Sequence, residues 1–204
     1  DGVPLAPAPY AAPAAYYFPM PSRLIGVEVV KGAAAIRYGP QTIGGAINLL
    51  TRRVPVNETV AQADVAYGAF QTQKAHGYAG HGTDRWGLLA EASHMATDGF
   101  KELDDGGPTG FERQDAMVKA RIGTDNTADV FSEIELKIGY GRERSDETYV
   151  GLTQSDFDSN PDRRYAGSGT DRMEWTRQQA SLTWRLLLGE AVDVRTVAYH
   201  HSLD

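Results

Sequence analysis

The chain has 204 residues, a formal net charge of −7 and no cysteine. The negative charge, with no cluster of Lys and Arg to offset it, excludes nonspecific attraction to nucleic acid. The lack of cysteine excludes disulfides, thiol nucleophiles and zinc–thiolate sites. No run of about 18 apolar residues is present, so the sequence predicts no transmembrane helix. A low mean hydropathy remains compatible with membrane strands, because these alternate between apolar and polar residues.

The segment from Asp1 to Pro21 is rich in proline and alanine and contains several tyrosines. Prolines at this density remove backbone donors and disfavour helix. We therefore expect an irregular, ordered loop after a short strand. A low-complexity linker is the alternative interpretation.

A glycine-rich stretch from Val27 to Arg53 predicts two short strands joined by turns. Val27 and Val29 alternate with their neighbours as in a half-buried strand, and Ile47 and Leu49 do the same. Glycines that can adopt positive φ without a Cβ clash lie between them, namely Gly32, Gly39, Gly44 and Gly45. The same pattern would also fit a glycine-rich connection in any small α+β domain.

From Glu58 onward the sequence alternates with a period of two, in seven segments of about the length of a membrane-spanning strand, roughly 9–11 residues. The segments are Val60–Ala69, Gln71–Gly82, Trp86–Met95, Ala116–Gly123, Val130–Arg144, Gln178–Leu188 and Val192–His201. Short connections (Gly82–Arg85, Asp125–Asp129, Gly189–Ala191) alternate with long ones (Thr97–Arg113, Ser145–Met173), and the short link Gly68–Gln71 is the exception. Outer-membrane barrels have this asymmetry, although a soluble antiparallel sandwich would also alternate along its strands.

The alternation also assigns a face to each strand. The side chains predicted to face lipid include Leu136, Ile138, Leu182, Trp184 and Leu186. The side chains predicted to face the lumen include Glu133, Glu135, Lys137, Thr183 and Arg185. Seven strands cannot close a barrel, and an open edge in hydrocarbon leaves backbone groups unsatisfied. We therefore expect further strands to complete the sheet.

No catalytic constellation is visible in the sequence. It contains neither a G-x-S-x-G elbow nor an H-E-x-x-H helix, and paired carboxylates such as Glu133 and Glu135 fit a polar lumen lining. The five histidines are scattered without the spacing of metal ligands. The sequence predicts neither an enzyme nor a bound metal or cofactor.

The strings V-E-V-V-K-G, I-R-Y-G and G-G-A-I-N-L-L-T-R resemble the C-terminal half of the plug of TonB-dependent outer-membrane receptors. Asp1-Gly2-Val3-Pro4-Leu5 is similar to an earlier plug strand. The resemblance implies a mostly β fold. Residues 1–54 would form the C-terminal half of a small α+β plug, and residues 55–204 about seven antiparallel strands of an incomplete, 22-stranded transmembrane β-barrel. No signal peptide opens the chain, so we expect a fragment or truncated product that lacks the earlier part of the plug.

The resemblance also implies sites and partners. Tyr10, and after it Tyr16 and Tyr17, would contact the ligand from an apical plug loop. A basic residue after the V-E-V-V string, here Lys31, would help to lock the plug to barrel glutamates, and Arg37 is assigned to the same lock. The TonB complex would bind upstream of this chain, and the barrel would lie in outer-membrane lipid.

The connection Ser145–Met173 holds the clearest clue to a ligand. Its G-L-T, D-F and P-D-R-R-Y strings are similar to a loop of receptors for iron(III) dicitrate. Arg163 and Arg164 could bind the carboxylates of an anionic ferric chelate, or they could be solvated or paired with nearby aspartates. Three other functions remain open: uptake of another siderophore or nutrient, a passive or adhesin-like barrel, and a soluble carbohydrate-binding or hydrolytic β module.

Overall fold

A computed structural model describes residues 1–5, 17–39, 42, 44–125 and 127–204, and the fold is mostly β. Seven long strands dominate: β3 (Glu58–Tyr67), β4 (Gln73–Gly82), β5 (Trp86–Thr97), β7 (Phe111–Gly123), β8 (Val130–Asp146), β10 (Arg172–Leu188) and β11 (Val192–Leu203). No helix in the described ranges is long and apolar enough to cross a membrane.

The seven strands form one antiparallel sheet in the order in which they occur in the sequence, from β3 at one edge to β11 at the other. The sheet is open, since these two edge strands each pair on one side only. The seven predicted strands are confirmed. Three of them begin earlier than predicted, β3 by two residues at Glu58, β7 by five at Phe111 and β10 by six at Arg172. In β7 and β10 the ladder with β8 continues through stretches that carry polar residues on both faces.

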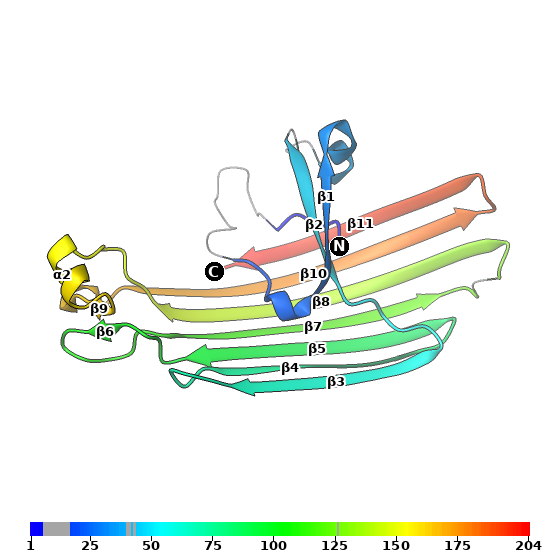
Figure 1. Cartoon of the computed structure of the whole chain (residues 1–204). Coiled ribbons are helices and arrows are strands. Elements are labelled where there is room, and N and C mark those ends of the chain that lie inside the picture. The colour runs from blue at the N-terminus through cyan, green and yellow to red at the C-terminus, as the bar shows by residue number, and fades with distance from the viewer. Residues whose placement is uncertain (6–16, 40–41, 43, 126) are drawn as a thin grey trace.

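The connections lie at two different ends of the sheet (Figure 1). The ends of β4, β7 and β10 and the starts of β5, β8 and β11, which short connections join, lie at one end. The longer connections lie at the other end and contain β6 (Glu102–Leu103), α2 (Gln154–Ser159), β9 (Arg163–Arg164) and η3 (Ala166–Ser168). β6 and β9 pair in parallel, so the two long connections meet in a second small sheet.

An N-terminal hairpin lies over one face of the large sheet (Figure 1). After η1 (Pro21–Arg23), β1 (Leu24–Lys31) pairs antiparallel with β2 (Gly45–Thr51), with Val27 opposite Leu49 and Val29 opposite Ile47. The two predicted strands are confirmed, and their connection contains a 3-10 helix, η2 (Gly32–Tyr38). Gly45 has a φ of 141°, and a Cβ there would lie 2.8 Å from the carbonyl oxygen of Val30.

The two faces of the sheet have opposite chemistry, and we call the face beneath the hairpin the inner face. Lys119, Glu91 and Asp115 lie on it and are buried. The outer face carries the aliphatic residues of the same strands, and Ile138 is 53% exposed there. This arrangement is the reverse of a soluble sheet, which packs its apolar face against a core.

Candidate functional site

The hairpin and the inner face meet through charged side chains, and the first contact is at η1. Arg23, the last residue of η1, forms an ion pair with Asp115 of β7, and both side chains are almost completely buried. The hydroxyls of Ser22 and Ser93 lie 3.1 Å apart beside this pair. Burial lowers the pKa of the Arg23 guanidinium from its ordinary value. The pair fixes the start of the hairpin on the middle strand of the sheet.

Aromatic and guanidinium groups extend this contact toward the end with the long connections. Tyr17 is buried and packs edge-on against Trp175 of β10, with ring centroids 5.1 Å apart. The guanidinium of Arg177 lies 4.3 Å from the centre of the Tyr17 ring. Arg113 donates to the backbone carbonyl of Phe18. The chain before η1 is thus held by stacking as well as by charge.

A second charged contact lies where the hairpin leaves β2. The Nε atom of Arg52 is 3.7 Å from a carboxylate oxygen of Glu91, a fully buried side chain of β5. The same oxygen lies 2.8 Å from Nε2 of His76 on β4. The Arg52 guanidinium also stacks 3.5 Å over the ring of Tyr78. One buried carboxylate therefore joins the hairpin to two neighbouring strands.

A third contact runs through the carboxylate of Asp1. It accepts a hydrogen bond from the backbone N–H of Thr51 at 2.9 Å and another from the Thr51 hydroxyl. The Lys137 ammonium is 2.7 Å from the same carboxylate and that of Lys119 is 3.5 Å from it. Lys119 also lies 3.6 Å from Glu135. Asp1 thus bridges β2 and the inner face.

The segment that follows the hairpin packs tightly against the sheet. Val54 forms a small apolar cluster with Leu89 and Met117, all nearly inaccessible to solvent. A Cβ at Gly87 would approach Val54 to 2.6 Å. The exit from the hairpin is therefore fixed by close packing, which only glycine at this position permits.

Lys31 and Arg37, the predicted lock residues, lie elsewhere. Both are exposed, and Arg37 donates to the hydroxyl of its neighbour Tyr38 at 3.0 Å. Their role as a lock stays a prediction. Sequence reasoning missed Arg23 and Arg52, although two arginines that flank a predicted hairpin, facing strands with inward carboxylates, were a usable signal.

The long connections form a second site around Arg163. Its guanidinium lies 2.7 Å from Asp104 in one connection and 2.6 Å from Asp156 in the other. The hydrogen bond from Arg163 holds the pKa of Asp104 below its usual range. Hydrogen bonds from Thr153 and Tyr165, followed by the charge of Arg163, lower the pKa of Asp156. The guanidinium is thus engaged by two ionised carboxylates.

Arg164 is buried in the same region and has a different environment. Its guanidinium donates to the backbone carbonyls of Pro108, Glu147, Ser168 and Asp171. These carbonyls belong to both long connections. Arg164 therefore holds the loop framework together.

The structure does not bring the predicted ligand residues into one site. Tyr10 and Tyr16 lie outside the described residues, and Tyr17 is packed against Trp175 on the inner face. Arg163 and Arg164 lie in the long connections and are occupied as described above. Ligand binding by these residues stays a prediction. Within the described ranges no group of His, Cys, Asp or Glu is arranged to hold a metal ion.

Comparison with known proteins gives no family for this chain. No protein-family model matches it, and no solved structure matches it. Its function must be argued from its own residues.

Proposed function

We propose that the chain belongs to a TonB-dependent outer-membrane receptor that takes up an anionic ferric chelate. In this proposal the seven-stranded sheet is a segment of the barrel wall, and residues 1–54 are part of the plug. The outer face contacts lipid, and the inner face lines the lumen. The chain makes and breaks no bond. It binds the chelate, and the plug moves when the TonB complex pulls on it.

The observation that carries the proposal is the reversed burial of the sheet. Val118 and Ile138 lie on one row of the outer face and Leu136 and Leu182 on the next, and each is about two-fifths exposed or more. Leaving this much aliphatic surface in water is unfavourable by roughly 25 cal/mol per Å². A lipid environment removes that cost, and the mixed charges of the inner face then meet the plug and water.

Aromatic residues at both ends of the apolar outer face support a membrane location. Trp86 and Trp184 lie toward the short turns, and Tyr67 and Tyr140 lie toward the long connections. Their side chains are all at least one-third exposed. Tryptophan and tyrosine concentrate at membrane–water interfaces, and outer-membrane barrels have such a girdle at each side.

The hairpin favours a receptor over a passive channel. It is fixed on the charged inner face by Arg23, Arg52 and Asp1, where it would obstruct a lumen. A passive pore has no need of such an element. Ion pairs between the hairpin and the sheet can also be broken and re-formed without unfolding either part.

Ferric citrate is our first candidate for the chelate. Its carboxylates could replace Asp104 and Asp156 around Arg163, because all of them offer oxygen acceptors for a guanidinium. Another carboxylate-rich siderophore would satisfy the same requirement.

Lipid-dependent cysteine labelling tests the membrane location. Single cysteines at 182 and 183 are treated with a water-soluble maleimide, with and without phospholipid vesicles. We expect vesicles to protect position 182 strongly and position 183 little. A soluble β module would stay out of the vesicles, and position 182 would then be labelled equally fast in both conditions.

A separate measurement tests the ligand. Binding of radiolabelled ferric citrate to the vesicle-inserted chain is compared with binding of an uncharged ferric chelate. Preferential, saturable binding of ferric citrate supports the assignment. Equal retention of both chelates would contradict it without affecting the membrane location.

A further inference from the structure

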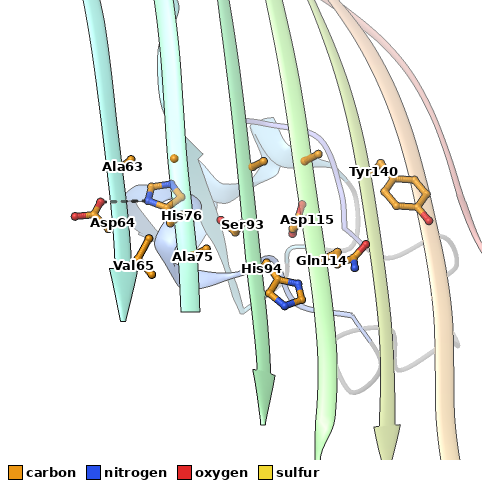
Figure 2. A pocket seen from close by; sticks show the side chains of 13 residues that line it. Ala63, Asp64, Val65, Ala75, His76, Ser93, His94, Gln114, Asp115 and Tyr140 are labelled. Atoms are coloured by element: carbon orange, nitrogen blue, oxygen red, sulfur yellow. Dashed lines mark ion pairs between the residues drawn. The ribbon is translucent and has the colours of Figure 1, made fainter. Parts of the chain in front are cut away.

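A groove of about 570 Å³ lies on the outer face of the sheet, over β3, β4, β5, β7 and β8 (Figure 2). Its volume is in the range of about 300–1,000 Å³ that ligand pockets occupy. Small residues form one row across four strands beneath it: Ala63, Gly77, Ala92 and Ala116. Tyr140 continues that row on β8 and forms a wall of the groove.

A polar row lies immediately beyond this small-residue row. His94, Gln114 and Arg142 are register partners on β5, β7 and β8. Figure 2 shows His94 and Gln114 at the groove, on β5 and β7. Gln114 donates to Glu112 at 2.8 Å. Arg142 is exposed and, among the residues that the structure describes, forms no ion pair.

We propose that this groove binds a membrane lipid with a phosphate headgroup. One acyl chain lies over the row of alanines and glycine, and Arg142 binds the phosphate with Gln114 beside it. The proposal rests on the membrane location of the outer face, since a lipid reaches the groove only there.

The position of the groove matches the two ends of such a lipid. Tyr140, at the groove wall, marks the end of the apolar surface, and tyrosine prefers the depth of the headgroups. The acyl chain would extend from there across β7, β5, β4 and β3, and the phosphate would lie at the polar row. A guanidinium without a counter-ion suits a phosphate, because both groups can form two parallel hydrogen bonds.

The outer face of β8 and β10 is bulkier nearer the short turns. There it carries Leu136, Ile138, Leu182 and Trp184, all more than one-third exposed. Lipids that contact these strands would exchange freely with the surrounding bilayer. The small residues on β3, β4, β5 and β7 leave room for one chain in a fixed place.

Native mass spectrometry of the chain, released from nanodiscs of equal phosphatidylglycerol and phosphatidylcholine, tests the proposal. We expect phosphatidylglycerol to be retained over phosphatidylcholine. Arg142→Gln should reduce the retention of phosphatidylglycerol by about tenfold, the loss of one charge-assisted contact. Ala116→Leu should fill the groove and reduce the retention of both lipids.

Two control variants make the same changes of charge and bulk elsewhere on the outer face. Arg172→Gln removes a cation that is already paired with Asp146, and Ala198→Leu adds bulk on β11; neither should change lipid retention. Equal retention by the parent, Arg142→Gln and Ala116→Leu would overturn the lipid site. Failure of the chain to enter nanodiscs at all would instead refute the membrane location on which the site depends.

Discussion

At the scale of single residues, the neighbouring arginines of the long connections have separate roles. Arg164 is buried and supplies donors to four carbonyls, so Arg164→Ala leaves these acceptors without partners. We expect the local opening free energy of the loops to fall by about 2–4 kcal/mol. Hydrogen exchange at the amide of Glu147, which donates to the Asp171 carbonyl at 2.9 Å, measures this.

Arg163→Ala is the matched variant. Its side chain is about one-third exposed, so its ion pairs are screened and the loops should open less than in Arg164→Ala. Ferric citrate binding should show the opposite order. Per folded molecule, Arg163→Ala should bind ferric citrate more weakly than Arg164→Ala. An equal loss of loop protection in both variants would contradict this division of roles.

The Asp104–Arg163 pair also predicts a dependence on pH. The pKa of Asp104 is lowered in the folded loop by the hydrogen bond from Arg163, so the folded loop prefers the ionised form. The stabilisation is therefore complete above the ordinary carboxyl value and is lost as pH falls through the lowered folded value. We expect exchange protection of the Asp104 amide to decrease between about pH 5 and about pH 3, after correction for intrinsic rates. In Asp104→Asn this decrease should be smaller.

The residue contacts were the part of the site that the sequence could not predict. Alternation shows that Lys119 and Glu91 point inward, but it does not show that they meet Asp1 and Arg52 of the N-terminal segment. Arg23 and Asp115 are 92 positions apart, and only the packing of η1 on β7 brings them together. The burial of Arg164 also could not be predicted from the sequence, because an Arg pair in a polar loop is normally solvated.

At the scale of elements, the faces of the strands give the sharpest prediction. Leu182 is on the outer face of β10 and Thr183 on the inner face. Leu182→Arg, near the middle of the apolar surface, should reduce stability in lipid by about 2–4 kcal/mol. Equilibrium urea unfolding in phospholipid vesicles measures this, with Thr183→Arg as the control. A larger loss for Thr183→Arg would show that the faces are reversed.

Strand number and the two faces were predictable because most of the strands, β8 and β10 above all, alternate through their central part. The extra length of β7 and β10 was not, since Phe111–Asp115 and Arg172–Arg177 carry polar residues on both sides. There the ladder continues because β8 offers backbone partners. The β6–β9 pair is only two residues long in each strand and has no periodic signal.

At the scale of the whole molecule, the buried Arg23–Asp115 pair is expected to control docking of the hairpin on the sheet. Arg23→Ala leaves a buried carboxylate without its partner, which should cost about 3–5 kcal/mol. Trp175 packs on Tyr17, so its fluorescence in a Trp86→Phe, Trp184→Phe background reports docking during urea titration.

Two further variants complete that experiment. The double variant Arg23→Met, Asp115→Leu removes both charges and should recover most of the loss. Lys31→Ala tests the lock that the family resemblance suggests. Because Lys31 is exposed in the structure, we expect it to weaken docking less than Arg23→Ala. A larger loss of docking in Lys31→Ala would show that Lys31, rather than Arg23, holds the hairpin on the sheet.

The order of the strands has a consequence for how the sheet forms. Every long strand pairs with the long strand that precedes it in the sequence, so no pairing requires a distant segment to return. Such a ladder has low contact order, and the edge of each completed strand offers backbone groups with which the next strand can pair. The parallel β6–β9 pair is different, because it can close only after β8 has been added and the second long connection is in place. Assembly of the sheet would thus proceed one strand at a time in sequence order, and the β6–β9 pair would form after the strands that flank it.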